Sequence, residues 1–127
     1  LPIGLDPMQR SKSVIKVISI NNELNKSDFS NYMLSKYADK TYLGAPGSNI
    51  YSCIPDNKHI AMDGTSMAAP IVTGSIALLK SVNPDLTNTE IINILWTTSI
   101  TSEDGLTPII QIDKALKMAT TFWTKKI

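Results

Sequence analysis

One stretch of the sequence places a hydroxyl nucleophile where the backbone would favour negative charge. The segment from Asp63 to Pro70 reads Asp-Gly-Thr-Ser-Met-Ala-Ala-Pro, and it joins an extended arm to an apolar run. If that run is a helix, its first-turn amides and the positive end of its dipole face any anion that develops near the Ser66 Oγ. Gly64 leaves room beside this oxygen for a bound chain. The segment therefore predicts a serine in a cleft that can act as a nucleophile.

The apolar run after Ser66 predicts the helix that must support it. Residues 67–79 are apolar or small on every side, which is typical of a helix buried all round. Pro70 is expected within the first turn or so, where its missing amide removes no intrahelical hydrogen bond. Asn83 and Pro84 then end the helix. Small residues within the run would let neighbouring backbone approach closely, namely Ala68, Ala69, Gly74, Ser75 and Ala77.

Strands and turns are predicted before this helix. Residues 21–40 are polar without a sustained period and predict a long, partly packed connection. The Gly-Ala-Pro-Gly turn at residues 44–47 closes the strand that precedes it. The turn-rich residues 55–58 join two later strands into a hairpin. The expected strands lie at residues 14–20, which are rich in β-branched side chains, and at residues 41–43, 50–54 and 59–62.

Two further helices are predicted after Pro84. Thr87 and Glu90 form a capping box, and Leu86 with Ile91 would make the hydrophobic staple across it. The last helix is expected to begin around Asp113, which would be its cap. Apolar side chains recur at helical spacing in both helices and indicate core faces rather than a cofactor site: Ile91, Ile92, Leu95 and Trp96 in the first, and Leu116, Ala119 and Trp123 in the second, before the basic pair Lys125 and Lys126.

Composition excludes several classes of function. The 127 residues are 43% hydrophobic and carry a formal charge of +1, which fits one globular domain without a basic face for nucleic acid. Polar residues and Pro70 interrupt residues 67–79, so we expect no membrane span. One cysteine and one histidine exclude an intrachain disulfide and a Cys/His zinc cluster. Because the chain opens at Leu1 without a signal segment, we expect it to derive from a longer protein.

Residues 64–70 carry a close family resemblance. Their sequence, Gly-Thr-Ser-Met-Ala-Ala-Pro, followed by Val72 and Gly74, closely resembles the nucleophile segment of subtilisin-like serine proteases. The related sedolisins share the Gly-Thr-Ser core but not usually Met-Ala-Ala-Pro, so the resemblance is to the subtilisin branch.

The resemblance covers nearly the whole chain in the same order. It implies an α/β fold, the C-terminal portion of a three-layer subtilisin-like structure with a partial, mostly parallel sheet and a buried central helix after the nucleophile. Residues 1–127 would then be the C-terminal part of a single, incomplete peptidase domain. The other matching segments are the strand at residues 14–20, Phe-Ser-Asn at 29–31, Ala-Pro-Gly at 45–47, the helix at 83–99 and the closing strand and helix at 109–119.

The family's site residues transfer only in part. In subtilisin-like proteases an Asp, a His and a Ser form the triad in that chain order, and an Asn side chain joins the serine amide in the oxyanion hole. The resemblance implies that Ser66 is the acyl-accepting nucleophile and that its N–H is half of the oxyanion hole. Gly64, Thr65 and Met62 would border the substrate cleft, with Met62 on the leaving-group side. The other catalytic groups would precede Leu1, so this chain alone is expected to be inactive.

Three neighbouring residues have competing interpretations. His59 is a candidate base, but along an extended arm it would lie roughly 20 Å from Ser66, so we expect an exposed residue at the hairpin tip. Asp63 stands where the family usually has Asn, and a turn or cleft-wall role is favoured over catalysis. Cys53 is expected to be a small buried hydrophobe, because no basic residue or helix start lies beside it in sequence.

An incomplete domain would also need a partner. Half a sheet leaves an exposed edge, so we expect association with the upstream half of the domain or with a second copy of the chain. The family implies a peptide or protein substrate and often export and bound calcium, although no ligand-rich carboxylate loop is evident. The alternative is a catalytically silent, subtilase-derived binding or scaffold module, which Asp63 supports slightly.

Overall fold

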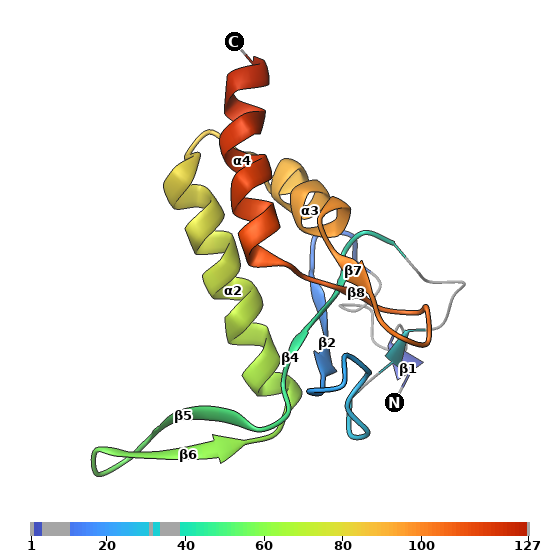
Figure 1. The fold of residues 1–127 in the computed structure, drawn as a ribbon, viewed down its shortest axis with the longest axis vertical. Coiled ribbons are helices and arrows are strands. Elements are labelled where there is room, and N and C mark those ends of the chain that lie inside the picture. Colours follow the sequence, from blue (N-terminus) through green and yellow to red (C-terminus); the bar gives the residue numbers. More distant parts are fainter. Residues whose placement is uncertain (1, 4–10, 31, 34–38, 127) are drawn as a thin grey trace.

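The computed structural model describes residues 2–3, 11–30, 32–33 and 39–126. Its main sheet has four strands in the order β2-β4-β8-β7, of which β2, β4 and β8 are parallel and β7 is antiparallel to β8 (Figure 1). This mostly parallel sheet confirms the predicted α/β class. The strands are β2 (Lys16–Ile20), β4 (Tyr42–Pro46), β7 (Ile100–Thr101) and β8 (Pro108–Ile109).

Strand β4 extends further toward the C-terminus than its sequence suggests. It continues through Pro46, although Gly-Ala-Pro-Gly predicts a turn there. Pro46 is tolerated because the Gly47 N–H, not its own nitrogen, donates to the Ile20 carbonyl in β2. The nitrogen of Pro46 points to the other edge of β4, the edge on which β8 lies. The pairing with β8 is at Gly44, so the missing N–H of Pro46 removes no hydrogen bond of that ladder.

Two small sheets complete the strands. β1 (Pro2–Ile3) pairs in parallel with β3 (Tyr32–Met33), so the predicted connection at residues 21–40 contains a short strand; its residues 31 and 34–38 lie outside the described part. β5 (Ile50–Ile54) and β6 (Lys58–Met62) form the predicted antiparallel hairpin. Asp56 and Asn57 in its loop have positive φ angles of 67° and 57°, a conformation that these residue types tolerate.

The helices described are α2 (Thr65–Val82), α3 (Asn88–Thr97) and α4 (Ile112–Lys126). The capping box of α3 is confirmed, since the Thr87 side chain accepts from the Glu90 N–H and the Glu90 side chain accepts from the Thr87 N–H. The cap predicted for α4 is wrong, because the helix begins at Ile112 and Asp113 lies within its first turn. The side chains of residues 122–126, including Trp123, lie outside the described part.

One face of the main sheet and the helices share the larger core. Leu86 and Ile91, the predicted staple, are both buried within it. A smaller cluster on the other face of the sheet contains Ile18, Ile20, Tyr42 and Ile109. The buried members of the larger cluster are Leu43, Ala45, Ala68, Val72, Leu79, Leu86, Ile91, Ile94, Leu95, Ile110, Ala115 and Ala119.

The helix α2 is buried along one face only. Its buried residues, such as Val72 and Leu79, face β2, β4 and α4, whereas Leu78 and Val82 are 50% and 48% exposed. The prediction of a helix buried all round is therefore wrong for the described structure, because its neighbours cover one side. At 18 residues α2 is long and apolar enough to cross a membrane by length and composition alone, and one of its faces packs against β2, β4 and α4.

Candidate active site

Ser66 lies at the start of α2, beyond the carboxyl ends of the parallel strands β2 and β4. It is the second residue of the helix, and it is exposed. Figure 1 shows the first turn of α2 where β4 ends and the hairpin begins. The first amides of a helix have no intrahelical acceptor, so the Ser66 N–H is available to an anion beside its own hydroxyl. Ligands of open parallel sheets commonly bind at this edge.

Gly64 sets the geometry of that helix start. It is the N-cap residue without a side chain, and its φ of 155° is one that other residue types rarely adopt. Its N–H donates to the Gly47 carbonyl at 2.8 Å, and its carbonyl accepts from the Met67 N–H at 2.9 Å. A Cβ at Gly64 would lie 3.1 Å from the Ser66 Oγ. Glycine therefore keeps the Ser66 hydroxyl accessible and ties the helix start to the sheet.

The turn at residues 47–49 is the other half of this junction. Gly47 lies so close to the helix start that a Cβ there would be 2.9 Å from the Gly64 carbonyl oxygen. Two residues on, the Asn49 N–H donates to the Asp63 carboxylate, and Asn49 has a positive φ of 56°. Asp63 thus stabilises the turn, in agreement with the role predicted for it.

Beneath this turn lies a buried chain of hydroxyls that no sequence pattern indicated. The Ser19 and Ser27 oxygens are 2.9 Å apart, and the Ser27 and Ser48 oxygens are 2.6 Å apart. Ser19 is 0% exposed and Ser27 is 2% exposed. The three serines come from β2, the following loop and the turn, so only the tertiary structure brings them together. The spacing of these serines in the sequence does not predict their contacts.

Pro70 lies deeper in the helix than predicted. Because α2 begins at Thr65, two residues before the apolar run, Pro70 is its sixth residue rather than a first-turn residue. A residue at that position would normally donate to the Ser66 carbonyl, and proline cannot. The expectation that Pro70 removes no intrahelical hydrogen bond is therefore wrong, and the Ser66 carbonyl lacks its usual helical donor.

The hairpin does not bring His59 to Ser66. His59 is exposed, pairs with Cys53 near the tip, and stacks on the Tyr51 ring with centroids 5.4 Å apart. The prediction of an exposed histidine is confirmed. The prediction of a buried Cys53 is wrong, because its side chain is exposed in a strand whose residues alternate between half-buried and exposed.

Met62 and Thr65 flank the junction in sequence and in space. Met62 is the last residue of β6 and is 44% exposed, while Thr65 is the first residue of α2 and is half-buried. Both therefore lie within one or two residues of the Gly64 cap. Their role at a substrate cleft stays a prediction.

The perturbed titratable groups lie away from this junction. Burial lowers the pKa of Lys16, whose ammonium donates to the Ser11 carbonyl and the Thr41 hydroxyl at the amino end of β2. The Ser102 hydroxyl lowers the pKa of Asp104, with further help from the Leu106 N–H. The described residues contain no cluster of three or more His, Cys, Asp or Glu side chains that could hold a metal ion.

Comparisons with known proteins agree with the predicted family. The profile of the Subtilase family matches residues 6–120. Subtilisin-like protease 1 of Plasmodium falciparum is 42% identical over 84 residues, which are 65% of this chain and 12% of that protein. Subtilisin DY of Bacillus licheniformis is 34% identical over 93 residues, which are 73% of this chain and 32% of that protein.

A solved structure shares the fold. A protease from Pseudoalteromonas arctica superimposes with a TM-score of 0.74 and 28% sequence identity, covering 90% of this chain and 38% of that one. This chain therefore spans well under half of the length of each of these three proteins.

Proposed function

Because this chain belongs to the subtilase family, we propose that it is the C-terminal part of a serine endopeptidase domain and that Ser66 is the nucleophile. The supporting observation is the position of Ser66, exposed as the second residue of a helix whose cap, Gly64, is tied to Gly47 at the carboxyl edge of a parallel sheet. The triad Asp and His and the oxyanion Asn come from polypeptide outside this sequence.

In this proposal the chain supplies the attacking oxygen and groups that stabilise the negative charge of the reaction intermediate. The Ser66 Oγ attacks the carbonyl carbon of a peptide bond while the histidine of the upstream segment takes its proton. The negative charge that develops on the carbonyl oxygen is stabilised by the Ser66 N–H and the amino end of α2. Protonation of the leaving amine breaks the peptide bond, and water then hydrolyses the acyl-enzyme. Gly64 and Thr65 border the bound chain, and Met62 contacts its leaving-group side.

Without the upstream segment the same serine has no base. His59 is the chain's one histidine, and it projects from the far part of the hairpin. A serine hydroxyl is a weak nucleophile at neutral pH when no general base adjoins it. We therefore propose that the 127-residue chain alone is inactive.

A fluorophosphonate probe tests the proposal in the full-length protein. We expect covalent labelling that maps to Ser66 and is abolished by Ser66→Ala. Ser81→Ala is the matched control, because Ser81 is an exposed serine of the same helix, bonded to the Leu78 carbonyl, and its loss should leave labelling unchanged. The isolated 127-residue chain should react at least about 10³-fold more slowly, as expected when a triad member is missing. A folded full-length protein that is not labelled would instead identify a catalytically silent binding or scaffold module.

The same proposal predicts a partner for the exposed face of α2. Leu78 and Val82 lie on it, each about half exposed. We propose that the upstream half of the domain covers this face, or a second copy of the chain where that half is missing. Sedimentation of the 127-residue chain should show self-association that the separately produced upstream half displaces. A folded monomer at high dilution would contradict this. Export of the parent protein remains an expectation from the family, to be checked by cell fractionation.

A further inference from the structure

We infer that the buried hydroxyl chain Ser19–Ser27–Ser48 is a positioning device for the nucleophile, an inference that rests on the function proposed for Ser66. None of these serines touches the reacting atoms. They act through the turn at residues 47–49, which holds the start of α2. They are therefore positioning residues and not catalytic ones.

The hydroxyl chain is fully paired in its interior. Ser27 lies in the middle, with its oxygen 2.9 Å from that of Ser19 and 2.6 Å from that of Ser48. A buried hydroxyl destabilises the fold unless it is hydrogen-bonded, so removing the middle member leaves its buried neighbour short of a partner. The chain thus joins the last part of β2 to the turn through side chains alone.

The backbone holds Ser27 in place independently of its hydroxyl. The Ser27 N–H donates to the Ser19 carbonyl at 2.8 Å, and the Ser19 N–H donates to the Ser30 Oγ at 3.0 Å. These bonds occupy the edge of β2 at Ser19 that faces away from β4. Replacing Ser27 with alanine therefore removes the hydroxyl link and leaves the loop attached to the strand.

Each residue of the turn at 47–49 makes a different hydrogen bond, either to the residues before Ser66 or to the buried serines. The Gly47 carbonyl accepts from Gly64, the Ser48 hydroxyl bonds to Ser27, and the Asn49 N–H donates to Asp63. Two of these anchors are the residues directly before the Thr65–Ser66 pair. The third is the hydroxyl chain, which is the one connection from this turn's side chains into the buried floor.

Gly47 also lies directly on the first member of the hydroxyl chain. A Cβ at this position would be 2.1 Å from the Ser19 Oγ and 2.9 Å from the Gly64 carbonyl oxygen. The turn thus lies between the Ser19 hydroxyl and Gly64, the cap residue of α2. If the turn moves relative to β2, Gly64 must move with it, and so must the Ser66 amide and hydroxyl. A displacement of reacting groups by about 1 Å can reduce a reaction rate about 10²-fold.

The test compares Ser27→Ala with wild type in the full-length protein. We expect the rate constant for phosphonylation of Ser66 by a fluorophosphonate, in which Oγ displaces fluoride from phosphorus, to fall about tenfold, with little change in the concentration for half-maximal rate, because the substituted residue does not contact the reagent. Hydrogen exchange of the backbone around Gly64 should become about tenfold faster, while exchange in α3 stays unchanged. Ser81→Ala is the control for both measurements.

A double-mutant cycle separates positioning from general loss of stability. Ser19→Ala with Ser27→Ala removes both members of a buried pair, so the double variant should be less impaired than the sum of the single variants. Ser48→Ala, at the half-buried end of the chain, serves if Ser27→Ala does not fold. Unchanged phosphonylation of Ser66 and unchanged exchange at Gly64 would overturn the inference, as would equal acceleration of exchange in α3. If wild type is not labelled, the proposed function fails, and the exchange measurement still decides whether the hydroxyl chain fixes the turn.

Discussion

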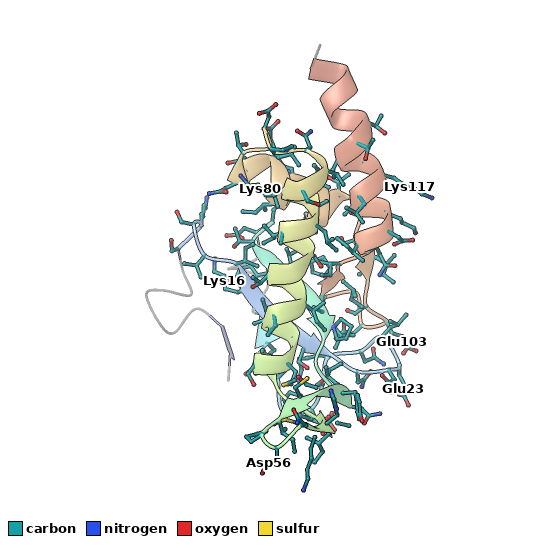
Figure 2. All side chains as sticks on the ribbon, turned by 90° about the vertical axis from the view of Figure 1, so that its left-hand side faces the viewer. Lys16, Glu23, Asp56, Lys80, Glu103 and Lys117 are labelled. Carbon is teal, nitrogen blue, oxygen red and sulfur yellow. The ribbon has the colours of Figure 1, made fainter. Side chains whose placement is uncertain are left out.

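The turn-to-helix junction and the β5–β6 hairpin are neighbours in sequence, yet they are held in opposite ways. The junction, residues 47–49 with Gly64, is connected to β2, to Asp63 and to the start of α2 by hydrogen bonds. Among the described residues, the hydrogen bonds that hold the hairpin between these segments are those of its own ladder, and every residue of β6 is exposed. Figure 2 shows its tip, marked by Asp56, at the opposite end of the molecule from Lys80 in the last turn of α2.

This comparison shows which residues fix the position of Ser66. An isolated two-stranded ribbon is marginally stable in water, so the hairpin is positioned through its base. Its base is the junction, where Gly47 and Gly64 bring two backbones together. The side chains that the hairpin presents, His59 and Cys53 among them, face solvent. Ser66 is therefore positioned by the residues around the two glycines and not by the strands that lie between them in sequence.

The largest effect should come from filling the junction. Gly47→Ala places a methyl group against the Ser19 hydroxyl and the Gly64 carbonyl, and we expect the free energy of unfolding to fall by about 3 kcal/mol or more. Gly74→Ala is the matched control, because a Cβ there meets nothing within 4 Å and alanine favours the helix by about 1 kcal/mol. Denaturant titration of the 127-residue chain measures both, because in the full-length protein the face of α2 that carries Gly74 is the one proposed to be covered. Equal stability of the Gly47 variant and wild type would break the contrast between junction and hairpin.

A second effect compares the two faces of the helix that Ser66 begins. Leu79→Ala creates a cavity at a fully buried position and should lower the free energy of unfolding by about 3 kcal/mol. Leu78→Ala, next to it in sequence and half exposed, should cost less than about 1 kcal/mol in the isolated chain. In the full-length protein the cost of Leu78→Ala should rise toward that of Leu79→Ala if the upstream half covers this face. An unchanged small cost there would contradict the proposed covering.

The contrast also explains how much of the site the sequence could predict. The start of α3 was predictable because its cap is local, with Thr87 and Glu90 bonding to each other's backbone three residues apart. The start of α2 was predicted at the apolar run after Ser66 rather than at Thr65, because Gly64 has no capping side chain and its partner, Gly47, is distant in sequence. Residue patterns report bonds within an element and are silent on those between elements. The error in the position of Pro70 follows directly from this.

Burial in the hairpin shows the same limit from the other side. Alternation and turn residues predicted its arms and its loop, because the ladder is local. The exposure of Cys53 depends on what packs over the strand, and residue type alone predicted the opposite. The hydroxyl chain of Ser19, Ser27 and Ser48 likewise joins three separate segments. Family resemblance placed Ser66, but the groups that hold it became visible only in three dimensions.

A smaller effect concerns the opposite end of β2 from the junction. Burial lowers the pKa of Lys16 from its ordinary 10.5, so between the lowered value and 10.5 the unfolded chain binds more protons than the folded one. Stability should therefore rise with pH across that window, and Lys16→Met should remove this part of the pH dependence. Denaturant titrations in steps from pH 8 to 10.5 measure the slope. An identical slope in the variant would show that Lys16 is not its source, and Ser66 labelling at pH 7 should be the same in both proteins.

The smallest effects should come from the hairpin itself. His59→Ala and Cys53→Ala remove exposed side chains, and each should change the free energy of unfolding by less than about 0.5 kcal/mol. The rate of Ser66 labelling in the full-length protein should stay at the wild-type value, and the Cys53 thiol should react with a thiol reagent without unfolding. A tenfold loss of labelling in the His59 variant would mean that a second molecule brings this histidine to Ser66. The hairpin would then be part of the site. In that case the conclusion that the junction positions Ser66 and the hairpin does not would be wrong, and the rate of Ser66 labelling in the His59 variant would have shown it.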